Sequence, residues 1–225
     1  MKRSRINEIL REGDAFIRSH GVILPPFAYW APEALRAADH GTIKERRMGW
    51  DITDYGAEKF DEMGLFLFTT RNGRLSDLNK GRGMLYAEKI MISREQQLSP
   101  MHRHDLKAED IINRGGGKLV MELFASNPDG SIDRTSDVTV MVDGISRTVQ
   151  AGGLLKLDPG ESVTLMPGDW HAFWGEGGDV LIVEVSTVND DLLDNIFEME
   201  IGRFSNIEED EAPVHLLVND YDTML

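Results

Sequence analysis

Three histidines and one glutamate stand at spacings typical of a metal centre. The first three form the pattern His102-x-His104-x₄-Glu109, and His171 follows the turn-forming residues Pro167-Gly168-Asp169. Residues two apart in a strand point to the same face, so the imidazoles of His102 and His104 are expected side by side. A short loop can then turn back and add the carboxylate of Glu109. The predicted metal ligands are therefore His102, His104, Glu109 and His171.

A shell of three imidazoles and one carboxylate with open positions suits several divalent ions. Manganese, iron, cobalt, nickel and zinc all accept such ligands, and the residues do not choose among them. The sequence contains no cysteine, which excludes thiolate ligands, disulfides and a cysteine nucleophile. An ion held in this way would polarise a substrate oxygen as a Lewis acid.

Two further residues are predicted to transfer protons beside the metal. Lys107 lies between two ligands, so the loop must carry it close to the ion. A partly desolvated lysine next to a cation should have a lowered pKa, which suits acid–base chemistry. Glu184 lies in the middle of an apolar strand, on the same face as Ile182 and Ser186, where a carboxylate is costly unless it is used or paired. We therefore expect Lys107 and Glu184 to be catalytic, with a solvated loop lysine and an ordinary outward-facing glutamate as the alternatives.

The elements that must position these residues are mostly short strands. An N-terminal helix is predicted over residues 4–20, with Ser4 as its N-cap and Gly21 as its stop, and a second short helix over Pro32 to Ala38. Beyond them, apolar runs separated by turn signals predict about eight strands, as in an all-β sandwich or barrel. These strands cover residues 65–70, 85–92, 110–117 (broken by a glycine turn), 118–125, 138–142, 154–157, 162–166 and 180–188.

The pattern favours one domain over residues 1–225. Residues 1–60 form helical and extended decoration packed outside, residues 61–190 the barrel core and residues 191–225 a C-terminal tail. The tail is acidic. Its first part is expected either to be a solvated face or to fold over the mouth of the barrel.

Composition and charge exclude several classes of protein. The net charge of −15 argues against a nucleic-acid footprint, which needs a basic face. No run of about 18 apolar residues is present, so no membrane span is expected. A basic start without an apolar signal core, together with the absence of cysteine, indicates a cytoplasmic protein.

Long motifs in this sequence are similar to those of a known enzyme family. The two metal stretches resemble the two motifs of the cupin superfamily, in which two histidines and a glutamate come from the first and one histidine from the second. The match is closer to the D-lyxose isomerase family of sugar isomerases, and it extends over most of the chain. It is carried by Met1–Ser4, Leu24–Phe27, Tyr86–Met91, Met101–Gly117 and Glu184–Asp191.

The resemblance implies a fold, a reaction and a cofactor. The fold would be a single cupin β-barrel and the metal Mn²⁺. The reaction would interconvert D-lyxose with D-xylulose, and often D-mannose with D-fructose, as free monosaccharides. Members are commonly homodimers. Lys89 would bind a sugar hydroxyl or orient the base. The family's acidic residue before Arg203 is Gly202 here, so Glu200 takes its place as the third predicted catalytic residue.

Four more residues complete the predicted sugar site. Trp50 and Phe27 are candidates for an aromatic wall against the sugar, with core packing as the alternative. Asp191 and Arg203 follow the last strand and would bind sugar hydroxyls.

A metal-dependent cupin oxygenase with iron or nickel in the same shell is an alternative function, and a non-catalytic sugar-binding cupin is another. The lysine inside the metal motif favours an isomerase.

Overall fold

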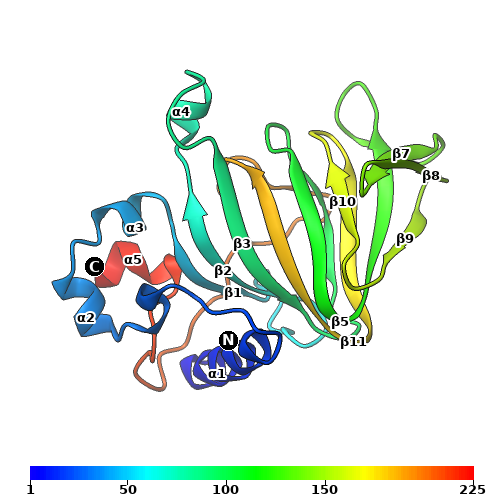
Figure 1. Cartoon of the computed structure of the whole chain (residues 1–225). Coiled ribbons are helices and arrows are strands. Elements are labelled where there is room, and N and C mark those ends of the chain that lie inside the picture. The colour runs from blue at the N-terminus through cyan, green and yellow to red at the C-terminus, as the bar shows by residue number, and fades with distance from the viewer.

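Strands dominate the structure, a computed structural model that describes all 225 residues (Figure 1). The helices are α1 (Arg3–Ser19), α2 (Pro32–Ala37), α3 (Gly41–Glu45), α4 (Leu75–Leu78) and α5 (Tyr221–Met224), with 3₁₀ turns η1 (Pro26–Tyr29) and η2 (Val218–Asp220). The strands are β1 (Gly49–Thr53), β2 (Leu65–Asn72), β3 (Tyr86–Ser93), β4 (Ser99–Arg103), β5 (Glu109–Ser126), β6 (Ile132–Asp133), β7 (Val138–Val142), β8 (Ile145–Val149), β9 (Gly153–Leu157), β10 (Ser162–Leu165), β11 (Trp170–Thr187) and β12 (Ile196–Phe197).

All twelve strands join one antiparallel sheet. Its main path runs β1-β2-β3-β11-β5-β10-β7-β8, with β4, β6, β9 and β12 attached beside it. The end strands β1 and β8 pair only with β2 and β7, so the path is not closed by hydrogen bonds. The all-β prediction is confirmed, in the form of a sheet-rich fold rather than a closed barrel.

Two 18-residue strands, β5 and β11, run through both halves of this sheet. The first half of β11 pairs with β4 and with the end of β5, while its second half pairs with β3 and with the start of β5. The register between β5 and β11 shifts twice near Gly115 and Gly116. The two halves therefore share their central strands, and residues of one strand reach both walls of the space between them.

The glycine turn predicted near Gly116 is wrong, because β5 continues through it. Gly116 adopts φ +90°, and a Cβ atom there would lie 2.0 Å from the carbonyl oxygen of Asp179 on β11. Only glycine allows this close approach of the two backbones. The glycines therefore let one strand bend instead of ending it.

Helix α1 covers one face of the sheet and is confirmed at its predicted place. Ile6, Ile9 and Ile17 are at most 1% exposed and pack against an apolar cluster that includes Phe66 and Phe68. Burying each such side chain contributes about 1.5–3 kcal/mol. The helix begins at Arg3, and its N-cap is Lys2 rather than the predicted Ser4. The hydroxyl of Ser4 donates to Asp210 instead.

The N-terminal and C-terminal segments lie against each other. Lys2 pairs with Glu208 in a β-bridge, and α2, α3 and α5 gather at one end of the sheet (Figure 1). Strand β1 belongs to the sheet, so residues 1–60 are more than the outer decoration expected for them. A single domain over residues 1–225 stays a prediction. No helix has the length and apolar character needed to cross a bilayer.

Candidate active site

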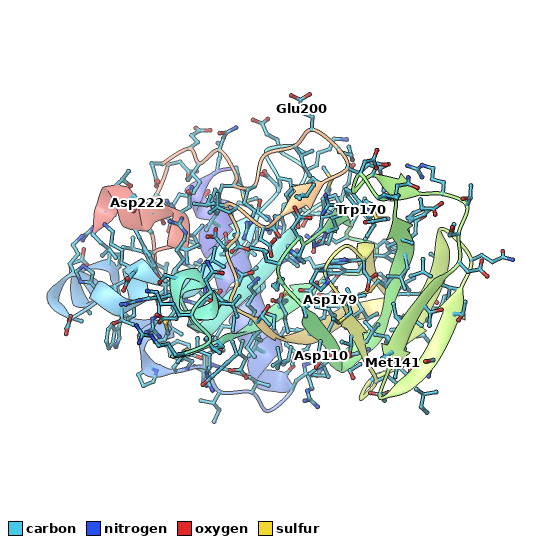
Figure 2. The ribbon with its side chains drawn as sticks, turned by 90° about the horizontal axis from the view of Figure 1, so that it is seen from above. Asp110, Met141, Trp170, Asp179, Glu200 and Asp222 are labelled. Carbon is cyan, nitrogen blue, oxygen red and sulfur yellow. The ribbon has the colours of Figure 1, made fainter.

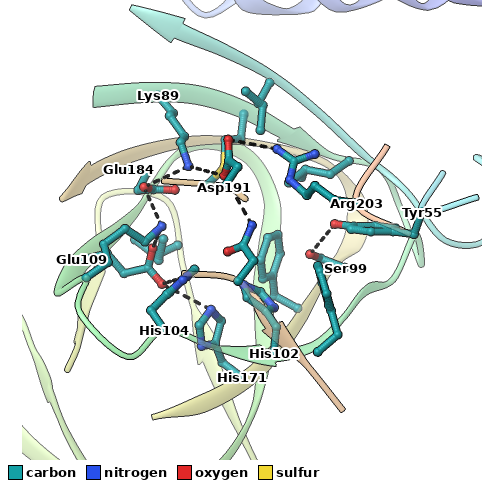
Figure 3. Close-up of a pocket in the computed structure, with 18 residues that line it drawn as sticks. Tyr55, Lys89, Ser99, His102, His104, Glu109, His171, Glu184, Asp191 and Arg203 are labelled. Carbon is teal, nitrogen blue, oxygen red and sulfur yellow. Dashed lines mark hydrogen bonds and ion pairs between the residues drawn. The ribbon is translucent and has the colours of Figure 1, made fainter. Parts of the chain in front are cut away.

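The three predicted histidine ligands meet in one pocket between the halves of the sheet (Figure 3). His102 on β4 lies opposite His171 on β11 in the strand register, with ring centroids 4.1 Å apart. His104 follows the end of β4, and its ring lies 5.2 Å from that of His102. One ligand atom from each of the three lies within 4.8 Å of the others. The predicted cluster is therefore assembled from two distant stretches of the sequence.

Backbone carbonyls orient each imidazole in the same way. The Nδ1 atoms of His102, His104 and His171 lie 2.8, 2.6 and 3.0 Å from the carbonyl oxygens of Pro100, Asp194 and Asp169. An Nδ1–H that donates to a carbonyl leaves Nε2 with its lone pair free for a metal. Burial, with the neighbouring histidines, holds the pKa of His102 well below its usual range, so the ring stays neutral.

The carboxylate of Glu109 completes this donor set. Its Oε1 atom lies 3.2 Å from Nε2 of His171 and 3.5 Å from Nε2 of His104. The same oxygen is buried and has no hydrogen-bond partner. A buried carboxylate oxygen without a partner is costly unless a cation neutralises it. The four residues therefore fit a divalent ion.

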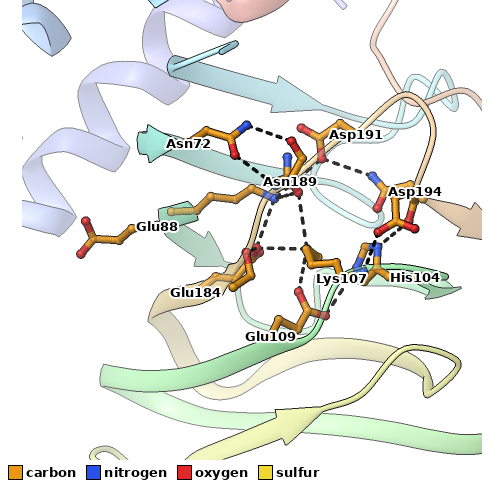
Figure 4. A network of polar contacts seen from close by, with 12 residues as sticks. Asn72, Glu88, His104, Lys107, Glu109, Glu184, Asn189, Asp191 and Asp194 are labelled. Atoms are coloured by element: carbon orange, nitrogen blue, oxygen red, sulfur yellow. Dashed lines mark hydrogen bonds and ion pairs between the residues drawn. The ribbon is translucent and has the colours of Figure 1, made fainter. Parts of the chain in front are cut away.

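Two lysines and a second carboxylate stand beside the ligands (Figure 4). Nζ of Lys107 lies 2.7 Å from Oε2 of Glu109 and 3.0 Å from Oε1 of Glu184. Nζ of Lys89 lies 3.4 Å from the same oxygen of Glu184. Glu184, Lys89 and Lys107 are each 3% exposed. Glu184 faces inward with the buried Ile182 and Ser186, which excludes the alternative of an outward-facing glutamate.

These charges set one another's protonation states. Burial alone would lower the pKa of Lys107, but the carboxylates of Glu109 and Glu184 outweigh it and raise the pKa. The two carboxylates thus act against the lowered pKa expected for Lys107 beside a cation. Burial would raise the pKa of Glu184, and the ammonium groups of Lys107 and Lys89 lower it. An ammonium donor thus faces a carboxylate acceptor.

The segment after β11 forms a wall of the pocket that faces the metal ligands. This is the second of the two alternatives given for the first part of the tail, in which it folds over the mouth of the barrel. Asp191 and Arg203 both line the pocket, and Nη2 of Arg203 lies 3.1 Å from Oδ2 of Asp191. The same guanidinium nitrogen lies 2.7 Å from Oδ2 of the buried Asp51. Nζ of Lys89 lies 3.7 Å from Oδ1 of Asp191. The structure brings these three predicted sugar-binding residues together.

Three other predicted site residues lie away from the pocket. Glu200 is exposed and points away from the molecule, because its segment turns to solvent (Figure 2). Trp50 is 2% exposed, packs on Phe66 and Phe68, and donates its indole N–H to the carbonyl of Ala28. Phe27 packs on Phe68 with ring centroids 5.2 Å apart. The two aromatic residues therefore belong to the apolar core, and the assignment of all three to the site is corrected.

Several pocket residues were missed from the sequence. Tyr55, Ser99 and Phe197 line the pocket without lying in a chemical motif. Asn189 accepts a hydrogen bond from Lys89 at 2.6 Å, and Asp194 accepts three backbone N–H groups of the loop before Glu109. Asn189 lay within a motif that carried the family resemblance, which was the one available signal.

Comparison with known proteins decides the family. The family model for D-lyxose isomerase matches residues 1–221. The chain belongs to the D-lyxose isomerase family. A D-lyxose/D-mannose isomerase of Serratia proteamaculans is 46% identical over 226 residues, and one of Escherichia coli O157:H7 is 45% identical over 227 residues. Each alignment covers 98% of both chains.

Solved structures support the fold of this D-lyxose isomerase family member. L-ribose isomerases of Cellulomonas parahominis and Acinetobacter sp. DL28, each with L-ribose, superpose with TM-scores of 0.62 at 14% identity. Both matches cover 92% of this chain and 98% of the other. Family and relatives together confirm the expectation of an aldose–ketose isomerase acting on free sugars, in preference to an oxygenase.

Proposed function

We propose that this enzyme interconverts D-lyxose with D-xylulose and D-mannose with D-fructose, using Mn²⁺ held by His102, His104, Glu109 and His171. One observation carries the proposal. One nitrogen from each of three imidazoles and the unpartnered oxygen of Glu109 converge beside a buried lysine–glutamate pair. The curated relatives, named D-lyxose/D-mannose isomerases, support the choice of the two aldoses.

The reaction moves a hydrogen between C1 and C2 and a proton between O1 and O2. When bound, the metal ion supplies Lewis-acid polarisation of the carbonyl oxygen. The carboxylate of Glu184 takes the proton from C2 and returns it to C1. Lys107, 3.0 Å from Glu184, donates a proton to O1 and accepts one from O2. Closely spaced donor and acceptor groups of this kind serve both directions of the reaction.

The remaining polar residues of the pocket hold the sugar. Lys89 and Asp191 are buried or half-buried groups of opposite charge that line the same wall as Arg203. Buried polar groups bind hydroxyls selectively, since a sugar that lacks the hydroxyl leaves them unpaired. The proposal includes a homodimer in the cytoplasm with a free monosaccharide as substrate. The absence of cysteine and the family resemblance support these last points.

Metal removal tests this function. We expect the enzyme to lose D-lyxose and D-mannose isomerisation after treatment with a chelator, and to recover it with Mn²⁺. Glu200→Gln, which changes an exposed residue outside the pocket, is the matched control and should keep full activity. Failure to form ketose from either aldose with any divalent metal would overturn the proposal.

Solvent deuterium at C1 or C2 of the product would support proton transfer, and its absence would indicate a hydride shift.

A further inference from the structure

Ser99 lies in the pocket because of an irregularity between two strands. His171 pairs with His102, and Phe173 pairs with Ser99, so the one residue between them on β11 lies opposite two on β4. His171 and Phe173 are two residues apart in a strand, so their side chains share a face. Because of the bulge, their partners His102 and Ser99 also point to one face of β4. Ser99 therefore stands one same-face step, about 7 Å, from the His102–His171 pair.

Tyr55 reaches this serine from the N-terminal part of the chain. Its hydroxyl lies 3.2 Å from Oγ of Ser99, and the two side chains share that single hydrogen bond (Figure 3). Tyr55 is 5% exposed and Ser99 is 1% exposed. Each hydroxyl has one donor and two acceptor sites, so one bond leaves a donor and several lone pairs unused. Nη1 of Arg203, in the same pocket, is also buried without a partner.

The backbone of Tyr55 is held in a conformation that a tyrosine rarely adopts. Its φ of +55° lies in the left-handed region, which is unfavourable for an L-residue with a bulky side chain. Three hydrogen bonds maintain it. Thr53 Oγ1 accepts the N–H of Tyr55 at 2.9 Å and donates to the carbonyl of Arg203 at 2.8 Å, while the N–H of Gly202 donates to the carbonyl of Tyr55 at 3.1 Å. Strain of this kind collects at functional sites.

The position of these groups identifies what they bind. If C1 and C2 of the sugar lie at the metal ligands and at Lys107, as the proposed function requires, the far end of an extended sugar chain must lie along the pocket. Ser99 and Tyr55 lie on the β4 side of that pocket. Ser99 is the next residue along β4 whose side chain shares the face of His102. Burial raises the pKa of Tyr55 to about 12, so its hydroxyl stays a neutral donor at ordinary pH.

We infer that Tyr55, together with Ser99 and Nη1 of Arg203, forms a subsite that binds the terminal hydroxyl of the open-chain sugar, and that Tyr55 sets the preference for sugars that carry this hydroxyl. This inference rests on the proposed function and names a part of the site in which the sequence predicts only Arg203. The ring of Phe197 packs edge-on against Tyr55 at 5.6 Å and fixes the direction of its hydroxyl.

The test removes the two hydroxyl groups of the subsite one at a time, first that of Tyr55 and then that of Ser99. Rates on D-mannose and on 6-deoxy-D-mannose are compared for the wild type, Tyr55→Phe and Ser99→Ala. A neutral hydrogen bond is worth about 0.5–1.5 kcal/mol, so Tyr55→Phe should lower kcat/KM for D-mannose by about 3- to 10-fold. The same variant should act on 6-deoxy-D-mannose as well as the wild type does. Ser99→Ala should show a smaller loss with the same dependence on the sugar.

Each other outcome overturns the inference. An equal loss on both sugars would make Tyr55 a structural residue, and no loss on either would mean that it does not contact the sugar. Metal content and Tm, measured on each variant, identify a loss that comes from a damaged fold. If the metal-loaded wild type converts neither D-lyxose nor D-mannose, the proposed function itself fails, and the subsite falls with it.

Discussion

Lys107 shows how far a residue's neighbours determine its chemistry. Its ammonium lies between Glu109, a metal ligand, and Glu184, a proton acceptor, and all three are nearly inaccessible to water. Burial of a lone lysine would favour the neutral amine, but two carboxylates within 3.0 Å reverse that preference. The residue therefore links the metal shell to the base.

Replacing this lysine should separate metal binding from turnover. We expect Lys107→Met, which keeps most of the side-chain volume, to retain the metal and to lower kcat by about 10²- to 10⁴-fold, the usual contribution of a positioned acid–base group. Metal content by elemental analysis and steady-state rates on D-lyxose check this. Lys118→Met, at a lysine whose side chain is 49% exposed, is the matched control. Loss of the metal in Lys107→Met would mean that the lysine mainly supports the loop.

At the scale of elements, Asp194 ties the segment after β11 to the loop that carries Lys107. Its carboxylate accepts the backbone N–H groups of Asp105, Leu106 and Lys107 at 2.8 to 2.9 Å, and its carbonyl oxygen lies 2.6 Å from Nδ1 of His104 (Figure 4). One buried residue thus shapes the loop and orients a metal ligand. Contacts behind a ligand commonly govern how tightly it binds the metal.

Asp194→Asn should weaken metal binding without removing any ligand. An amide replaces one of the accepting oxygens with a donor that faces backbone N–H groups, so the loop shifts relative to the backbone carbonyl that orients His104. We expect the affinity for Mn²⁺ to fall by about 10- to 100-fold. Competition with a metal-binding dye measures this. Glu198→Gln, an exposed residue of the same segment, is the control. Unchanged affinity in Asp194→Asn would show that the ligands keep their geometry without the loop contact.

The sequence predicts the elements with a regular apolar pattern and misses the others. Helix α1 and strands such as β2, β3 and β7 were expected close to their observed bounds. Strand β8 was missed because two of its five residues are intermediate and three are exposed, so it has no buried stripe. The run Gly115 to Gly117 predicts a turn, since a bend inside a long strand has the same local composition.

The site divides in a similar way. The residue types and spacings of the four metal ligands, His102, His104, Glu109 and His171, point to a metal. This signal can be recognised from the sequence without knowledge of the fold. Tyr55, Ser99 and Asp194 have ordinary types in ordinary surroundings. Only the strand register and the path of the last segment bring the first two to the pocket and Asp194 to the loop that carries Lys107. Trp50 shows the opposite error, a residue wrongly assigned to the site. From the sequence alone, an aromatic residue of the core cannot be distinguished from one that packs against a sugar.

At the scale of the whole molecule, a buried ion pair joins the two ends of the chain. Arg3 is fully buried, and its guanidinium contacts both oxygens of Asp220 at 3.0 and 2.8 Å. Glu209, with a half-exposed side chain, holds the other edge of the guanidinium. Arg3 begins α1, and Asp220 precedes α5, so this contact fixes the C-terminal segment against the sheet.

Removing one partner should destabilise the fold strongly. Breaking a buried ion pair costs about 3–5 kcal/mol, since it leaves an uncompensated buried charge. Because Glu209 still pairs with Arg3, we expect Asp220→Asn to lower the free energy of unfolding by about 3 kcal/mol, at the lower end of that range. Urea unfolding measures it. Asp210→Asn, at an exposed carboxylate bonded to Ser4, should cost far less. Equal effects of the two substitutions would contradict this role of the buried pair.

The pocket draws its two kinds of residue from different parts of the chain. The metal ligands, Lys107 and Glu184 all lie between residues 102 and 184, on or beside the central strands, whereas Tyr55, Asp191 and Arg203 lie in flanking segments that fold over them. Substitutions at Tyr55, Asp191 and Arg203 can therefore change which aldose is accepted while the reacting centre stays as it is, whereas a substitution at Asp194 in the same segment would disturb a metal ligand. Diversification of substrate range within such a lineage, or in directed evolution, can then begin at a few positions outside the central strands.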